Sequence, residues 1–586
     1  MSTFAAHDNA VVWPERLFTT RHKLTGIAAL AIFLASWHFA GIRASLLFQR
    51  ETVAAIWKLL SHLFPPEISP SFLATLSTAT GKTVAAALAG TLLSVLFGLP
   101  FGVLATATLW RRGSLHSAEH RTPLAIMMAV TSYLARTFLG FVRAVPDLVW
   151  GLLFVAGVGL GSLAGTLALG VAYSGVLGRV YADVFDHVDS RPLEALQSTG
   201  ATHLQIFLYG IWPQALPLVT AYTLYSFECC VRAASVIGFV GAGGIGYEIN
   251  ISMRLFDYGQ VLTLLLALIG LLALADGLSH FLRGKMGMHS ASDIERIPEN
   301  RPSRRYARAR ATLCLRSGRL LLWPLIVLAV GLSFYYAGFK PETLAEAGVL
   351  SQMSRFFGGL LHLDLDGTFV RSLGLLLSQT IAIALLGTTV GMILGFVLAL
   401  PATSKLIFLR VDSPGHHSRC EHAACWLSFW FARLILSVLR AVPELVWVLV
   451  CILAVGIGPF AGTIAIGLHT TGVLGKLYAD TMEEVPGGPV EALCAVGARR
   501  VQILVHGVWP LAKPMLRNYT LLRWETNLRA STILGLVGGG GLGQSVYNNL
   551  QLGFYPRVST LIILIFAMVQ VSDWIGDRAR YRAVSA

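Results

Sequence analysis

The sequence predicts an all-α membrane protein that is built from two similar halves. Of its 586 residues, 55% are hydrophobic and only 13% are charged, whereas an ordinary soluble chain carries about 25% charged residues. Its mean hydropathy is +0.66, and motifs of the first half return at a fixed distance in the second. These observations favour a polytopic bundle with about six helices in each half.

The net charge of +14 lies mainly in short segments between apolar runs, as it does when Lys and Arg stay on the cytoplasmic side. The densest basic stretch is 283–319, and no platform of aromatic and basic residues accompanies it. We therefore exclude nucleic-acid binding and expect a cytoplasmic tether against an anionic membrane face. The seven cysteines do not recur between the halves and predict no disulfide framework.

A gap-free tandem duplication organises the chain. The motif from Arg143 to Pro146 returns from Arg440 to Pro443, and a constant offset of 297 residues also relates many other positions. Chance agreement at so many positions is excluded. The predicted divisions are a first transmembrane domain at 1–282, a basic cytoplasmic linker at 283–319 and a second transmembrane domain at 320–586.

Each half contains apolar runs long enough to cross the membrane as helices. In the first half we expect spans at Leu24–Ile42, Thr80–Leu109, Leu139–Leu160, Leu163–Val184, Ile206–Phe227 and Gln260–Leu282. In the second half we expect them at Leu320–Phe339, Thr380–Ala402, Ile435–Ile457, Ile464–Ala479, Ile503–Leu522 and Thr560–Ile575. Arginines interrupt the apolar stretches Leu124–Arg143 and Trp426–Arg440, which we expect to be interfacial helices.

The basic segments fall on one side of the membrane if each half has about six spans. Both termini and the linker are then cytoplasmic, and the first span, which no signal-peptide cleavage pattern follows, remains as an anchor. The two halves have parallel topology, related by an axis along the membrane normal. The polar loops around Glu194 and Glu491 also face the cytoplasm.

These two loops carry the sharpest motif, which runs from Glu194 to Gly200 as EALQSTG and from Glu491 to Gly497 as EALCAVG. We expect a short helix with an acidic first turn, followed by a chain reversal at the glycine. The motif resembles the Glu-Ala-Ala…Gly signature of ABC importer permeases. The resemblance implies that the coupling to ATPases involves Glu194, Ala195, Gly200, Glu491, Ala492 and Gly497.

The resemblance narrows to the permease of phosphonate-type importers through the stretches RAVPDLVWGLLF and RAVPELVWVLVC and the segment around Glu228 and Arg232. It covers 72–276 and 369–573. It implies two type I importer transmembrane domains that form a pseudo-twofold dimer in a bacterial inner membrane. It also implies two partner ABC ATPases that bind ATP and Mg, an extracytoplasmic binding protein, and a phosphonate, phosphite or phosphate ester as ligand. The chain itself is then neither an enzyme nor a cofactor carrier.

Two acid–base pairs stand four residues apart near the ends of apolar runs, Glu228 with Arg232 and Glu525 with Arg529. Charges in such positions are costly and tend to be paired. The pairs either fix neighbouring helices or line a pathway in which arginine meets the oxygens of an anion. The sequence leaves both interpretations open.

A glycine-rich turn follows each pair, and we expect it at the outer end of the pathway as a gate or as a contact for the binding protein. The glycines are Gly241, Gly243, Gly244, Gly246, Gly538, Gly540, Gly541 and Gly543. Their Gly-x-Gly-x-x-Gly spacing lacks the preceding strand of a dinucleotide site. A second set marks a helix kink at the membrane interface: Arg143, Pro146, Asp147, Arg440, Pro443 and Glu444. Alternatively, each acid of this set pairs with its neighbouring arginine.

Two further motifs resemble a nucleotide-binding loop and a metal site, but we expect neither site to be present. The stretch Gly81-Lys82-Thr83 lacks the upstream glycine of a phosphate-binding loop, so ATP must be hydrolysed by another chain. The cluster His416, His417, Cys420, His422 and Cys425 has no counterpart in the first half, and we expect a solvated loop rather than a metal site. The remaining alternatives are an importer of another small solute, such as an amino acid or a different oxyanion, and a secondary transporter.

Overall fold

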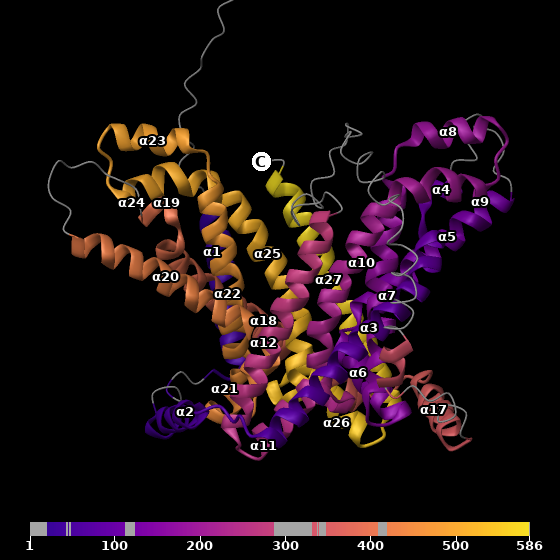
Figure 1. Cartoon of the computed structure of the whole chain (residues 1–586), viewed down its shortest axis with the longest axis horizontal. Coiled ribbons are helices and arrows are strands. Elements are labelled where there is room, and N and C mark those ends of the chain that lie inside the picture. The colour runs from indigo at the N-terminus through magenta and orange to yellow at the C-terminus, as the bar shows by residue number, and fades with distance from the viewer. Residues whose placement is uncertain are drawn as a thin grey trace, which may run out of the picture.

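The computed structural model describes residues 20–42, 45, 49–111, 123–285, 331–336, 338, 347–407 and 419–584. Over these ranges the chain folds into helices that are arranged as two similar halves (Figure 1). The predicted basic linker lies almost entirely outside the described residues, and so does most of the predicted span Leu320–Phe339.

The first half contains a short amphipathic helix, long apolar helices and two brief π-helices. Its elements are α1 (Thr20–Phe39), α2 (Arg50–Leu63), α3 (Pro70–Ala105), α4 (Ala107–Arg111), α5 (Pro123–Ala144), α6 (Asp147–Val158), α7 (Ser162–Asp186), α8 (Ser190–Ser198), α9 (His203–Gln205), η3 (Ile206–Ile211), α10 (Trp212–Ile237), η4 (Gly238–Ala242), α11 (Gly244–Arg254) and α12 (Tyr258–Lys285).

The second half repeats this order. Its elements are α17 (Ala347–Leu360), α18 (Gly367–Ala402), α19 (Ser404–Ile407), α20 (Arg419–Ala441), α21 (Glu444–Val455), α22 (Pro459–Glu484), α23 (Gly487–Ala495), α24 (Arg500–Ile503), η5 (Leu504–Val508), α25 (Trp509–Leu534), η6 (Gly535–Gly539), α26 (Gly541–Gln551) and α27 (Tyr555–Val584). The duplication inferred from the sequence therefore extends to the helices.

The predicted span Leu139–Leu160 is not one continuous helix, and its break lies at Pro146, where the sequence predicts a kink. The chain breaks before Pro146, and the helical segments Ala129–Ala144 and Asp147–Val158 are bent by 86° relative to each other. Proline lacks an N–H and disfavours helical conformation in the residue before it, which explains the break. Pro443 interrupts the second half in the same way, since α20 ends before it and α21 begins after it.

Of the two stretches expected to be interfacial, Ala423–Ala441 is long and apolar enough to cross a membrane, whereas Ala129–Ala144 meets this criterion only together with the bent segment that follows it. Within the described ranges, seven helices meet this criterion, or eight if the bent pair counts as one span. The helix α25 falls short although its first-half counterpart qualifies. Its charged residues lower its hydropathy: Lys513, Arg517, Arg523, Glu525 and Arg529.

Glycines allow the long helices of each half to approach closely. A Cβ on Gly90 of α3 would lie 2.7 Å from the Cβ of Leu169 on α7. The same contact in the second half joins Gly387 of α18 to Ile466 of α22, at 2.6 Å from Cγ2. Small residues let helix backbones pack tightly in a membrane, where burial of apolar surface provides little force.

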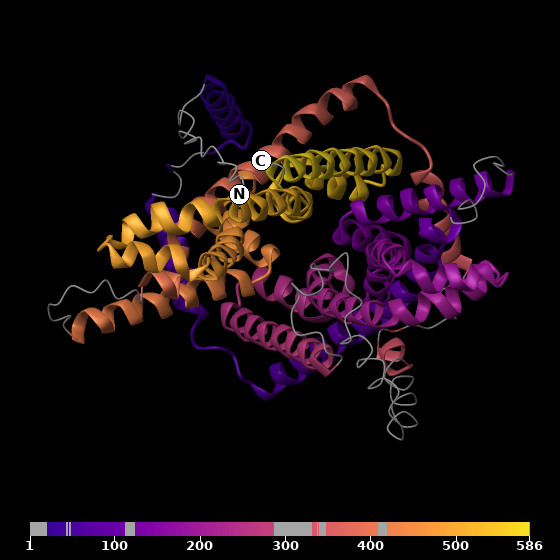
Figure 2. The ribbon, with the colours of Figure 1, turned by 90° about the horizontal axis from the view of Figure 1, so that it is seen from above.

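The halves meet along a shared apolar core that contains Leu148 and Ile237 of the first half and Leu445 and Leu534 of the second. Cross-half contacts also join α2 to α21, α17 to α6 and α27 to α5. Figure 1 shows α8 and α23 at one end of the molecule and α11 and α26 at the opposite end. Seen from above in Figure 2, the two halves lie side by side.

Candidate functional site

The first Glu-Ala-Leu motif forms the short helix α8, which lies at the end of the molecule (Figure 1). Leu193 is buried in a cluster with Phe207 and Ile211 and anchors the helix. Glu194 and Ala195 are exposed. Gly200 then reverses the chain with φ of 78°, a conformation that glycine adopts without strain. The helix therefore presents a polar face outward from an apolar anchor.

The second motif forms α23 with the same design. Val490 is buried, Glu491 and Ala492 are exposed, and Gly497 adopts φ of 74°. Both helices close with a backbone hydrogen bond from the residue after the glycine, Ala201 to Leu196 and Ala498 to Leu493. This bond satisfies a carbonyl that the end of the helix would otherwise leave unpaired.

The expected acidic first turn is wrong in both copies. Glu194 is the fifth residue of α8 and Glu491 is the fifth of α23, so each lies one turn into its helix. In α8 the first turn is instead capped by Asp189, whose carboxylate accepts from the Arg191 N–H at 3.1 Å. The helix α23 follows Pro486, which provides no side-chain cap.

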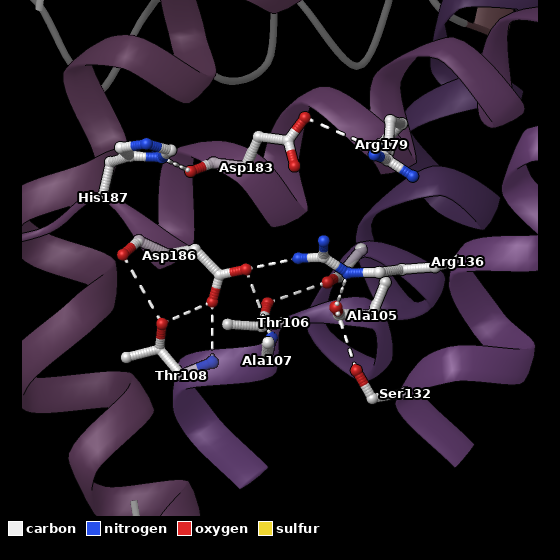
Figure 3. Close-up of polar contacts among 11 residues, drawn as sticks. Ala105, Thr106, Ala107, Thr108, Ser132, Arg136, Arg179, Asp183, Asp186 and His187 are labelled. Atoms are coloured by element: carbon white, nitrogen blue, oxygen red, sulfur yellow. Dashed lines mark hydrogen bonds and ion pairs between the residues drawn. The ribbon is translucent and has the colours of Figure 1, made fainter. Parts of the chain in front are cut away.

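An ion pair joins two of the long helices shortly before α8 begins (Figure 3). Arg136 of α5 contacts Asp186, the last residue of α7, and its Nε donates to the Ala105 carbonyl at 2.7 Å. Asp186 also accepts from the Thr108 N–H at 2.7 Å. We call this arrangement the latch. It joins the ends of α3 and α7 to the start of α4 and the interior of α5, four residues before α8 begins.

The second half repeats the latch with a different acid. Arg433 Nη2 lies 2.9 Å from Glu483 Oε1, and its Nε donates to the Ala402 carbonyl at 3.1 Å. Glu483 accepts from the Ser404 N–H at 2.7 Å. The sequence comparison aligned Arg136 with Arg433 but missed the acids, because an Asp in one copy stands opposite a Glu in the other. A search for retained charge rather than retained identity would have found them.

The glycine-rich segments form tightly packed turns. Gly241, Gly243 and Gly244 have positive φ, and so do Gly538, Gly540 and Gly541. A Cβ on Gly246 would lie 1.8 Å from the Ser235 carbonyl oxygen, and one on Gly543 would lie 1.9 Å from that of Thr532. Only glycine fits at these two positions, so the turns are rigid rather than flexible.

A threonine of the first long helix holds each turn. Thr83 Oγ1 accepts from the Ile245 N–H at 2.9 Å, and Thr380 Oγ1 accepts from the Leu542 N–H at the same distance. Thr83 belongs to the stretch that imitates a phosphate-binding loop, where the sequence suggested no role. A threonine recurs at the equivalent position, Thr380, although the residues before it differ. This recurrence was the sequence feature that could have indicated a role for Thr83.

A cavity of about 1080 Å³ opens between the two turns at the end opposite α8 and α23. Both halves line it, with Leu152 and Val155 from α6 and Leu449 and Ile452 from α21. Arg254 adds a guanidinium, and Gln551 stands at the matching position of the second half. The broken helices and the glycine turns thus enclose one shared space.

The family described as the binding-protein-dependent transport system inner membrane component matches residues 121–287 and 426–582, one segment in each half. The chain belongs to this family. It resembles the phosphate-import permease protein PhnE of Mycolicibacterium smegmatis, with 30% identity over 94% of this chain and 93% of that one. It also resembles the phosphite transport system permease protein PtxC of Stutzerimonas stutzeri, with 34% identity over 43% of this chain and 84% of that one.

The family assignment makes the chain a multi-pass permease of the inner membrane with a duplicated transport domain. It belongs to a transporter that depends on a binding protein and is not itself an enzyme. The helical fold and the tandem arrangement predicted from the sequence are therefore confirmed.

Charged residues of the permease meet across the seam between the halves. Arg143 of the first half and Arg529 of the second each lie 3.5 Å from Asp573, on different carboxylate oxygens. Glu525, which the sequence paired with Arg529, is buried and packs against Gly576 of α27. In the first half, Arg232 is exposed and Glu228 is partly buried.

The acids that follow the kinks of the permease do not pair with the neighbouring arginines. Pro146 and Pro443 cap α6 and α21. Glu444 contacts Arg523 at 2.7 Å and His469 at 3.4 Å rather than Arg440. The carboxylate of Asp147 accepts the Leu148 N–H of its own helix at 2.9 Å. Sequence analysis missed Arg523 and His469 because it searched for residues present in both copies.

No group of three or more potential metal ligands occurs among the described residues of the permease. The loop residues His416 and His417 lie outside the described ranges, and the side chains of Cys420 and His422 are not described either.

Proposed function

We propose that this permease imports a small phosphorus oxyanion (a phosphonate, phosphite or phosphate) and that two partner ATPases drive it through α8 and α23. The observation that carries the proposal is the placement of these helices. They project at one end of the molecule, each with an exposed glutamate, while the shared cavity opens at the other end. In this proposal the end with α8 and α23 is cytoplasmic, as are both termini.

The latch gives each coupling helix a mechanical route to the pathway. A displacement of α8 moves the end of α7, where Asp186 is bound to Arg136 of α5 and to the start of α4. The helix α5 leads through the break at Pro146 into α6, which lines the cavity. Motion at the ATPase end is thereby passed to the cavity wall as a rigid-body shift.

In this mechanism the glycine turns are the parts of the outer gate that stay in place. Their glycines leave no space for a side chain, and the threonines of α3 and α18 hold them in place. A binding protein docks over the cavity between the turns and delivers the ligand. Alternating access then requires α6 and α21 to move relative to the glycine turns.

Two observations support a phosphorus oxyanion as the ligand. The relative that aligns along nearly its whole length carries the name of a phosphate-import permease. In addition, the seam brings two arginines of different halves, Arg143 and Arg529, to one carboxylate, Asp573. Arginine recognises the oxygens of phosphate groups through its fork of N–H donors.

The test is uptake by the permease reconstituted with its ATPases and binding protein in proteoliposomes. We expect ATP-dependent uptake of radiolabelled phosphate or phosphite. An excess of methionine, which tests the alternative of an amino-acid importer, should not compete with this uptake. Glu194→Ala and Glu491→Ala should each lower both uptake and the ATP hydrolysis that the loaded binding protein stimulates. Glu51→Ala removes an exposed glutamate of α2 at the opposite end and is the matched control. Unchanged uptake in both coupling variants would contradict the assigned role of α8 and α23.

A further inference from the structure

The start of α21 carries a charged cluster that the start of α6 lacks. Arg523 Nη2 of α25 donates to Glu444 Oε1 at 2.7 Å, and His469 Nε2 of α22 lies 3.4 Å from the same oxygen. The side chains of Arg523 and His469 are each 13% exposed, and that of Glu444 is 24% exposed. Charges so far from water are costly to maintain without a function.

The matching positions of the first half hold Asp147, Ala172 and Ser226. Neither of the last two carries a charge. Within the described part of the chain, Asp147 has no basic side chain within ion-pair distance, and its carboxylate accepts an N–H of its own helix. Among the described residues, an arginine therefore binds the acid that follows the break in the second half, and none binds its counterpart in the first.

We propose that Arg523 is the oxyanion contact inside the translocation pathway, and that Glu444 is the resident counter-anion that occupies this contact until substrate displaces it. This inference rests on the proposed function, since it assigns the proposed ligand to one side of the pathway. The ligand class is a small tetrahedral oxyanion with at least two free oxygens, such as phosphate, phosphite or a phosphonate.

The position of the cluster supports this assignment. Glu444 begins α21 directly after the break in the chain, and α21 continues into the wall of the shared cavity. Interrupted helices form the substrate sites of many transporters. Across the seam, Asp147 and Arg232 of the first half lie close enough to Glu444 to interact with it electrostatically.

The geometry of Arg523 leaves donors for a substrate. A guanidinium has five N–H donors. One nitrogen, Nη2, binds Glu444, and Nε lies 3.5 Å from Thr470 Oγ1. If Glu444 withdraws, Nη2 also becomes free, and the side chain can bind two oxygens of one anion.

The carboxylate has a second partner to receive it. His469 lies against the same oxygen, and its Nδ1 lies 3.2 Å from the Val442 carbonyl, which fixes the ring. Both ring nitrogens face acceptors, so His469 can receive Glu444 only as a doubly protonated, charged ring, and the transfer from Arg523 therefore takes up a proton. Without that proton a withdrawn Glu444 would be a stranded buried charge, which is strongly unfavourable.

The experiment uses the complete complex in proteoliposomes with saturating binding protein and radiolabelled inorganic phosphate. Arg523→Gln should lower uptake roughly ten- to hundred-fold, the size expected from losing charge-assisted hydrogen bonds. The ATP hydrolysis that the loaded binding protein stimulates should stay within about two-fold, because the coupling helices and latches are intact. Ser226→Ala changes the matching position of the first half and should alter uptake less than two-fold.

A charge exchange separates binding from structural support. The double variant Glu444→Arg with Arg523→Glu restores an ion pair but places the carboxylate on α25, and we expect uptake to stay low. Recovery of uptake in this variant would show that only the pair matters and would overturn the proposal. A fall in stimulated ATP hydrolysis that parallels the loss of uptake in Arg523→Gln would also overturn it.

The outcomes also distinguish this inference from the proposed function. If the unaltered complex fails to take up any phosphorus oxyanion, the proposed function is wrong and the inference falls with it. If the unaltered complex imports phosphate and Arg523→Gln imports it equally well, only the assignment of Arg523 is wrong.

Discussion

Asp147 begins α6 in the first half and Glu444 begins α21 in the second, yet their surroundings differ in nearly every polar group. Glu444 meets an arginine and a histidine, whereas the positions equivalent to those two residues hold a serine and an alanine around Asp147. One turn further along α25 from Arg523, Asn527 donates to Thr388 and Thr470, and its counterpart is Cys230. The centre of the permease therefore carries a hydrogen-bonded charged cluster on one side that the other side lacks.

Elsewhere the halves are more alike. Each half has a latch arginine that donates to a helix-end carbonyl, and a threonine that holds the glycine turn at 2.9 Å. In the proposed mechanism, the parts that transmit motion are thus largely shared by the two halves, while the parts proposed to meet the ligand differ. Four comparisons between equivalent residues test this division.

The largest effect is expected at the glycine turns. Gly246→Ala and Gly543→Ala each force a Cβ into a backbone carbonyl, at 1.8 Å and 1.9 Å. We expect each variant to lose roughly 3 kcal/mol or more of unfolding free energy, because backbone cannot move aside as a side chain can. Thermal unfolding in nanodiscs measures this loss. Gly270→Ala and Gly374→Ala are controls with open space around the new methyl group, and they should be neutral or slightly stabilising.

The next effect is expected at the latches. Arg136→Ala and Arg433→Ala each remove the cation of a partly buried ion pair and should cost about 2 kcal/mol, between the values for exposed and buried pairs. Both should also reduce uptake per ATP hydrolysed, to a similar extent. Arg179→Ala breaks an exposed pair with Asp183 on one helix and should cost about 0.5 kcal/mol or less. A large effect in only one latch variant would refute their equivalence.

A smaller difference is expected between the coupling helices. Asp189 caps α8, whereas α23 begins with Gly487 and Gly488 after an uncapped start. Hydrogen exchange should therefore be faster in the first turn of α23. Gly488→Ala, which meets no neighbouring atom, should stabilise α23 by about 0.5 to 1 kcal/mol. Asp189→Ala should destabilise α8 by about 1 kcal/mol, and equal exchange rates in the unaltered permease would contradict the comparison.

The smallest effect is expected in the loop before α18. Arg557 donates to Asp364 at 2.9 Å and lowers the pKa of that carboxyl below its ordinary value of 3.8. The first half has Glu67 and Gln260 at these positions and no such pair. Because the pKa is lowered on folding, the pair contributes stability at pH values above 3.8 and loses it as the pH falls through the folded-state pKa.

Hydrogen exchange of residues 361–366 measures this contribution. Arg557→Gln, which copies the first half, should speed exchange in this loop at neutral and mildly acidic pH. The difference from the unaltered permease should disappear in stronger acid, once Asp364 is protonated. A difference that grows as the pH falls would have the wrong sign for this pair.

The sequence predicted the features that repetition reveals. The constant offset located the two halves, the coupling segments and the glycine turns, because identical residues recur there. It predicted a kink at Pro146 but still expected one span across it, since hydropathy does not report a bend of 86°. It missed the latch because Asp186 contacts an arginine 50 residues earlier in the chain, and only folding brings them together.

Arg523 escaped prediction for the opposite reason, since it occurs in one copy alone. A permease assembled from two copies of one gene product would receive any such substitution twice, on both sides of the seam. Fusion of the copies removes this constraint, so a mutation can add one arginine to α25 and leave α10 with Ser226. The covalent link thus provides evolutionary freedom: the interior of one half can change while that of the other stays as it was.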